Sequence, residues 1–148
     1  MPNSTSRNNT NTDVTGADTR PAQGLYFLVA EDHEFQRGMM VQMLESLGAK
    51  AVHEAEDGHS ALEVSRELDH PFDIIVTDID MPGMDGMQLL DELSQLDEQL
   101  PVLLITGHGD VPMAVEAMQL GAFDFLEKPF DPDRMSELAR RATATRRL

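Results

Sequence analysis

Residues 73–86 read DIIVTDIDMPGMDG, in which an apolar run is followed first by acids and then by a turn. A continuous apolar run of this length, bounded by Pro and Gly, is typical of a strand that is buried on both faces of a sheet. Asp78 should therefore emerge at the carboxyl end of that strand, where a ligand can reach it. An earlier apolar run, residues 25–30, ends in the same way at Glu31 and Asp32. Three carboxylates at strand ends indicate a cation site that handles phosphate.

The rest of the chain alternates between short apolar runs and helical patterns. The runs predict five strands, at residues 25–30, 50–55, 73–77, 101–105 and 123–126. The helical patterns predict five helices, which begin near Phe35, Ala61, Asp85, Asp110 and Asp131. Gly48 should form the C-cap of the first helix, and Asp85 should open the third in a capping box with Gln88.

Five strand–helix units in succession predict an α/β fold. Because helical crossovers join consecutive strands, the strands should be parallel, with right-handed connections and helices on both faces of the sheet. We expect a flavodoxin-like, doubly wound (βα)5 fold whose five-stranded parallel sheet has the order 2-1-3-4-5. In that order the first and third strands are neighbours, so Glu31, Asp32 and Asp78 should converge in one crevice.

The predicted cluster favours phosphoryl chemistry. Three carboxylates repel one another, and a divalent cation such as Mg²⁺ (or Mn²⁺) removes that repulsion while binding phosphate oxygens. Asp78 is the candidate nucleophile, since attack by its carboxylate on a phosphodonor gives an acyl phosphate. Thr106 closes the fourth strand and can donate its hydroxyl to a phosphoryl oxygen. Lys128 follows the fifth strand and can supply a mobile positive charge, and Pro129 after it allows a cis peptide bond.

The composition limits the partners and the compartment. The chain of 148 residues has a formal net charge of −16, so direct binding of nucleic acid or of a membrane surface is not expected. The lack of cysteine excludes disulfides and Cys-based zinc sites, and it suits a cytoplasmic protein. We expect residues 1–23, rich in Asn, Thr and Ser, to form a disordered polar tail. The folded domain should then occupy residues 24–145, and residues 146–148 should end the chain or begin a linker.

Taken together, the motifs resemble the receiver domain of two-component response regulators, whose fold is CheY-like. The residues that carry the resemblance are Glu31, Asp32, Asp78 before MPGMDG, Thr106 and the KPF sequence at 128–130. Residues 105–118 are especially similar to receivers of nitrogen-fixation and dicarboxylate-transport regulators. Residues 29–37 look more like receivers fused to cyclic-di-GMP phosphodiesterase domains. The resemblance covers residues 24–145.

The resemblance implies how the phosphoryl group would arrive and where it would be held. Asp78 would be the phosphoacceptor, and the donor would be a sensor histidine kinase or a phosphotransfer protein. Asp32 would bind Mg²⁺ directly, Glu31 would bind it through water, and the backbone carbonyl of Asp80 would complete the protein ligands.

The resemblance also implies a switch. Thr106 and Lys128 would contact the phosphoryl group, and Phe125 would be the switch aromatic that swings inward when the threonine hydroxyl is drawn to the phosphate. Asp80 and His108 would tune the lifetime of the phosphoryl group. The face formed by the fourth helix, the fifth strand and the fifth helix would then control a downstream effector, a partner protein or a second copy of the chain.

Two other functions compete with this interpretation. The sequence Asp78-Ile79-Asp80 echoes the DxD motif of aspartate-nucleophile phosphatases. That motif normally ends the first strand, whereas this one ends the third predicted strand and has Pro82 where the phosphatases have Thr or Val. The other alternative is a degenerate receiver that only binds partners, although all five active-site positions carry functional residues.

Overall fold

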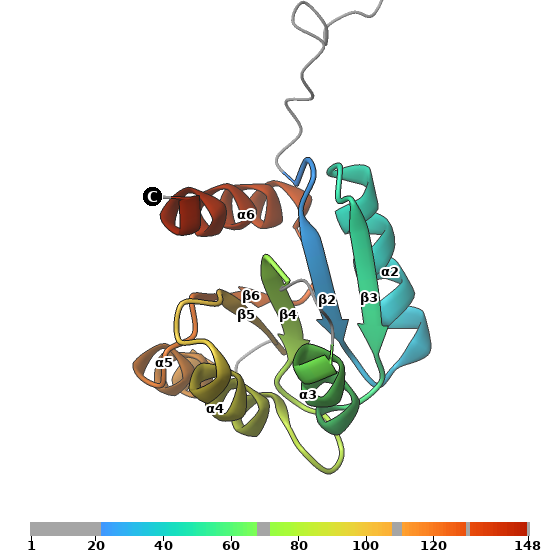
Figure 1. Cartoon of the computed structure of the whole chain (residues 1–148). Helices are drawn as coiled ribbons and strands as arrows, with labels where there is room; N and C mark the ends of the chain where they lie inside the picture. The colour runs from blue at the N-terminus through green and yellow to red at the C-terminus, as the bar shows by residue number, and fades with distance from the viewer. Residues whose placement is uncertain (1–21, 68–71, 108–110, 130, 148) are drawn as a thin grey trace, which may run out of the picture.

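The structure, a computed structural model, describes residues 22–67, 72–107, 111–129 and 131–147. In these residues five strands alternate with five helices (Figure 1): β2 (Tyr26–Ala30), α2 (Glu34–Ser46), β3 (Ala51–Ala55), α3 (Gly58–Glu67), β4 (Ile74–Asp78), α4 (Gly86–Leu96), β5 (Val102–Thr106), α5 (Val111–Gln119), β6 (Asp124–Glu127) and α6 (Pro132–Arg147). Each strand starts one residue later than predicted, and α3 starts three residues before Ala61. Most of the predicted tail, and the predicted helix start at Asp110, lie outside the described residues.

The five strands form one parallel sheet with the order β3-β2-β4-β5-β6. In chain order this is 2-1-3-4-5, so the predicted fold class and strand order are confirmed. The central strands β4 and β5 are buried at every position, as their continuous apolar sequences indicate.

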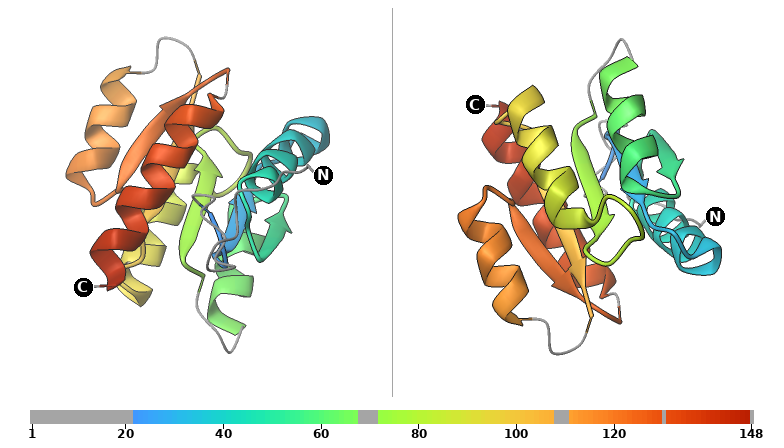
Figure 2. Two further views of the ribbon diagram at one scale, coloured as in Figure 1. Left: turned by 90° about the horizontal axis from the view of Figure 1, so that it is seen from above. Right: turned by 90° about the horizontal axis from the view of Figure 1, so that it is seen from below.

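Helices cover both faces of this sheet, and two hydrophobic clusters fill the space beneath them. On one face α2 and α6 pack over alternate strand residues, in a cluster that includes Val29, Val76, Leu44 and Leu138. On the other face α3, α4 and α5 pack over the intervening residues, in a cluster that includes Leu28, Ile75, Leu62, Leu90 and Ala117. Figure 2 shows α6 in front of the sheet in the left view and α4 in front of it in the right view.

Local signals explain several of the helix ends. The C-cap residue of α2 is Leu47 rather than the predicted Gly48. Gly48 follows it with φ 101°, a left-handed conformation that favours glycine just after a helix. Asp85 and Gln88 form the predicted capping box at the start of α4, with both hydrogen bonds present. By contrast, the N-cap residue of α2 is His33, which makes no side-chain capping bond. Glu31 and Asp32, which precede this N-cap residue, are therefore available to form a site at the end of β2.

The fold begins slightly before the predicted boundary. Ala22, which the sequence assigns to the tail, is fully buried, and its N–H donates to the carbonyl of Leu47 at 2.9 Å. The turn at residues 22–24 therefore ties the start of the described chain to the end of α2. Within the described part of the chain, every helix is too short or too polar to cross a membrane.

Candidate functional site

The carboxyl ends of four neighbouring strands meet at one edge of the sheet. The parallel register pairs Ala30 with Thr77, Asp78 with Ile105, and Thr106 with Glu127. The residues that follow β2 and β6, and those that end β4 and β5, are therefore brought to the same edge. These are the predicted site residues Glu31, Asp32, Asp78, Thr106 and Lys128.

The three acids converge as predicted. One carboxylate oxygen from each of Glu31, Asp32 and Asp78 lies within 4.8 Å of the other two. Glu31 and Asp78 are buried and Asp32 is half-buried, so water screens their charges poorly. Glu31 Oε1 and Asp32 Oδ1 are buried and have no hydrogen-bond partner among the described residues. Leaving such atoms unpaired is costly, and a divalent cation that prefers oxygen ligands would satisfy them. The acids present therefore fit Mg²⁺.

The electrostatics of Glu31 reflect the same crowding. Burial raises the pKa of its carboxyl from 4.5 to about 8, and the neighbouring Asp78 carboxylate adds to this effect. The backbone N–H of His33, which donates to Glu31 Oε2 at 3.1 Å, and the charge of Lys128 act in the opposite direction. A further positive charge, such as a divalent cation bound among the acids, would favour the ionised form of the Glu31 carboxyl.

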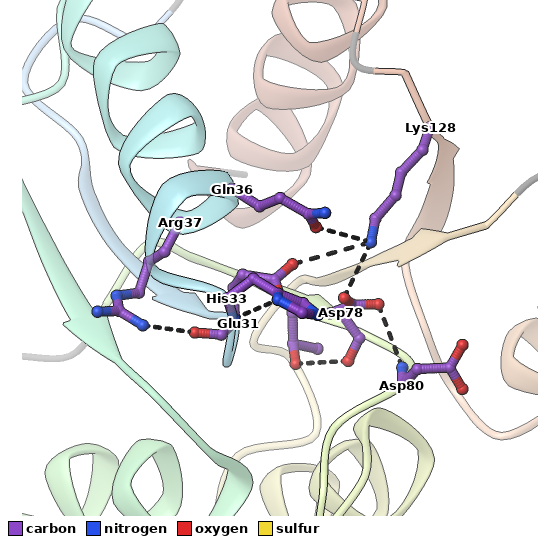
Figure 3. A network of polar contacts seen from close by, with 8 residues as sticks. Glu31, His33, Gln36, Arg37, Asp78, Asp80 and Lys128 are labelled. Atoms are coloured by element: carbon purple, nitrogen blue, oxygen red, sulfur yellow. Dashed lines mark hydrogen bonds and ion pairs between the residues drawn. The ribbon is translucent and has the colours of Figure 1, made fainter.

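Lys128 supplies the positive charge that the sequence predicts (Figure 3). Its ammonium Nζ lies 3.1 Å from Asp78 Oδ2 and 3.9 Å from Glu31 Oε1. The backbone N–H of Lys128 donates to the carbonyl of Thr106 at 2.9 Å, which fixes the start of the lysine stem next to the end of β5. The Lys128–Pro129 peptide bond is cis, as the sequence allows.

The turn after β4 holds the Asp78 carboxylate from the other side. The backbone N–H of Asp80 donates to Asp78 Oδ1 at 3.1 Å, whereas the side chain of Asp80 is exposed. Gly86 closes the turn by donating its N–H to the carbonyl of Ile79 at 2.8 Å. Both oxygens of Asp78 are thus hydrogen-bonded, one to the lysine and one to the turn, which fixes the orientation of the carboxylate.

The predicted switch residues lie at the same edge or beside it. Thr106 ends β5 and is 2% exposed. Phe125 lies within β6, half-buried, and packs against the cluster beneath α3, α4 and α5. His108 lies outside the described residues.

Two site residues on α2 are not among the predicted ones. Gln36 Oε1 accepts a hydrogen bond from Lys128 Nζ at 3.1 Å. Arg37 donates from Nη1 to the backbone carbonyl of Glu31 at 2.8 Å and from Nε to Glu54 at 3.0 Å, which ties the acidic loop to β3. The sequence pattern does not predict either residue as part of the site, because both contacts depend on how α2 lies over the sheet edge.

Comparisons with known proteins agree with this geometry. The family model of the response regulator receiver domain matches residues 27–140. The C4-dicarboxylate transport transcriptional regulatory protein DctD of Pseudomonas aeruginosa is 46% identical over 121 residues, which are 82% of this chain and 26% of that protein. The chemotaxis protein CheY of Bacillus subtilis is 39% identical over 110 residues, which are 74% of this chain and 90% of that protein.

A solved structure supports the same relationship. A response regulator receiver domain protein from Clostridium thermocellum superposes with a TM-score of 0.79 at 29% identity, covering 83% of this chain and 97% of that one. The chain therefore matches almost the whole of some relatives, but only a minor part of the length of DctD.

Proposed function

The chain belongs to the response regulator receiver family, and from this premise we propose that Asp78 accepts a phosphoryl group from a sensor histidine kinase or a phosphotransfer protein. Members of this family act as phosphorylation-dependent switches rather than as classical enzymes. The observation that carries the proposal is the Lys128 ammonium 3.1 Å from the Asp78 carboxylate, within a cluster of three converging acids. A carboxylate in this setting can act as a nucleophile, and a positive charge is already present where the phosphoryl oxygens would arrive.

In the proposed transfer, a carboxylate oxygen of Asp78 attacks the phosphorus of the donor. The O–P bond forms while the bond between phosphorus and the donor histidine breaks, and the leaving imidazole keeps that electron pair. The hydrogen bonds from Lys128 and from the N–H of Asp80 orient the nucleophile before the donor arrives. Lys128 and the Thr106 hydroxyl then contact the phosphoryl oxygens.

The acids around Asp78 are the proposed Mg²⁺ (or Mn²⁺) site. Asp32 and Asp78 would bind the cation directly, Glu31 would bind it through water, and Asp80 would contribute its backbone carbonyl. When bound, the cation neutralises charge on the equatorial phosphoryl oxygens. The buried, unpaired oxygens of Glu31 and Asp32 support this assignment.

The proposed output is a change at the face formed by α5, β6 and α6. Movement of Thr106 toward the phosphoryl group would free space that Phe125 can enter from its half-buried position. The altered face would then change its affinity for a partner protein, an effector domain or a second copy of the chain, with Asp80 and His108 setting the lifetime of the signal. We place this receiver unit from Ala22, which is buried against the end of α2, to the end of α6 at Arg147, and we place its action in the cytoplasm.

Incubation with acetyl phosphate and Mg²⁺, followed by intact-mass measurement, tests the proposal. We expect one added phosphoryl group that is not formed in the presence of a chelator and is absent from the Asp78→Asn variant. The absence of any addition, also with a panel of histidine kinases as donors, would contradict the switch and leave a binding module. Rapid release of phosphate over many turnovers would instead indicate a phosphatase.

A further inference from the structure

Gln36 reaches from the first turns of α2 to the lysine that faces the phosphoacceptor (Figure 3). Its side chain is half-buried, and its amide oxygen accepts a hydrogen bond from Lys128 Nζ at 3.1 Å. Lys128 Nζ donates at the same distance, 3.1 Å, to Asp78 Oδ2. The ammonium group has three N–H donors, so Gln36 and Asp78 together occupy two of them. Its distance to Glu31 Oε1 is 3.9 Å, too long for a third hydrogen bond.

The two partners of the ammonium differ in what phosphorylation would do to them. Asp78 becomes an acyl phosphate, so the oxygen that Lys128 now contacts changes its charge and its neighbours. Gln36 is neutral and takes no part in the reaction, so its amide oxygen can keep its place throughout. Lysine has a flexible four-carbon stem that carries considerable rotamer entropy, and a fixed second acceptor restricts where its ammonium can lie.

We propose that Gln36 is a positioning residue that holds the Lys128 ammonium beside Asp78 for phosphoryl transfer. The proposal rests on the proposed function and assigns to α2 a part in the chemistry beyond its packing on the sheet. The neutrality of the amide matters, because a fourth carboxylate at this point would bind the ammonium more tightly and repel an anionic phosphodonor. Gln36 therefore acts through Lys128 and needs no contact of its own with the phosphoryl group.

Phosphorylation rates of the full chain test this role. Gln36→Met keeps the length of the side chain and removes the acceptor, whereas Gln42→Met makes the same change at an exposed position of the same helix. We expect the rate constant at saturating acetyl phosphate to fall about threefold to tenfold in Gln36→Met, in the range for the net loss of one ordinary hydrogen bond, and to stay unchanged in Gln42→Met. The affinity for Mg²⁺ should not weaken, because Gln36 contacts Lys128 and is not one of the acids that would bind the cation.

A double-mutant cycle separates positioning from general stability. In a Lys128→Met background, Gln36→Met should have no further effect on the rate, because the group on which it acts is gone. A wild-type rate in the single variant, or effects that multiply in the double variant, would overturn the proposal.

A lysine-ammonium NMR spectrum gives a readout that does not depend on phosphorylation. The chain has only two lysines, Lys50 and Lys128, so exposed Lys50 serves as an internal control. We expect the Lys128 ammonium signal to shift or broaden in Gln36→Met while the Lys50 signal stays the same. If the wild-type chain accepts no phosphoryl group, the proposed function fails, and a shift of the Lys128 signal still supports the contact. An unchanged Lys128 signal would overturn the role of Gln36 whether or not the chain is phosphorylated.

Discussion

Replacing Gly86 by alanine should destabilise the protein, because this glycine lies against the backbone of the phosphoacceptor. Gly86 is the first residue of α4. A Cβ atom there would lie 2.8 Å from the Cα of Ile79 and would come even closer to the carbonyl oxygen of Asp78. Both neighbours are backbone atoms at the end of a buried strand, so neither can rotate away as a side chain can. The start of α4 must move away from the sheet edge instead.

The size of the effect follows from two opposing contributions. Overpacking at a tight site costs about 1–3 kcal/mol. Alanine is favoured over glycine in a helix by about 1 kcal/mol in the interior, and this gain is smaller in the first turn. We therefore expect Gly86→Ala to lower the free energy of unfolding by about 2 kcal/mol. For a chain of this size, that corresponds to a fall in Tm of about 4–8 °C.

Urea unfolding followed by circular dichroism measures this change, and Gly38→Ala is a matched control. Gly38 lies inside α2, where an added Cβ would meet nothing within 4 Å. That variant should gain about 0.5–1 kcal/mol, because glycine is unfavourable in a helix. If Gly86→Ala proved as stable as the wild type while Gly38→Ala showed its gain, the close approach of α4 to Asp78 would be refuted.

Three further predictions concern the charged groups. Lys128→Met should bind Mg²⁺ about fivefold more tightly in calorimetry, because the acids lose their positive neighbour. The same variant should accept phosphoryl groups about tenfold more slowly in acetyl phosphate kinetics, because the charge that meets the phosphoryl oxygens is gone. Without a divalent cation, stability should fall as the pH rises from 4.5 to about 8, because in this window the unfolded chain ionises Glu31 before the folded protein does. Urea unfolding of Glu31→Gln across that range should lack this slope, and an unchanged slope would assign it to other groups. Asp57→Ala should cost about 1 kcal/mol at neutral pH, because Asp57 Oδ1 accepts the N–H of Ser60 at 2.7 Å in the first turn of α3. This hydrogen bond lowers the pKa of Asp57. The difference in the free energy of unfolding between the variant and the wild type should therefore vanish as the pH falls through that lowered pKa. A difference that persists in acid would contradict the capping role.

The sequence predicts best those site residues whose positions follow from the topology of the sheet. Helical crossovers force the strands to be parallel, so residues that follow apolar runs must meet at one edge of the sheet. This is why Glu31, Asp32 and Asp78 can be predicted as a cluster from their places after two apolar runs. The same reasoning places Lys128 near Asp78, although the two residues are 50 positions apart.

Contacts that depend on the packing of helices over that edge leave no such pattern. Gln36 meets a lysine 92 residues away only because α2 lies where its half-buried side chain can span the gap. The approach of Gly86 to Asp78 likewise depends on the distance between α4 and the sheet. The start of α3 at Gly58 lies before the apolar stripe that predicts this helix, since that periodicity begins only at Ala61 while Asp57 supplies the hydrogen bond at the helix start.

The most direct test of the central claim is to locate the phosphoryl group on the chain. Borohydride reduces the acyl phosphate of an aspartate to homoserine, so tritiated borohydride leaves a permanent label at the phosphorylated residue. After incubation with acetyl phosphate and Mg²⁺, we predict label at Asp78 alone, and none in the Asp78→Asn variant. Label at Glu31 or Asp32, or an unlabelled wild-type chain, would contradict the assignment of Asp78 as the phosphoacceptor.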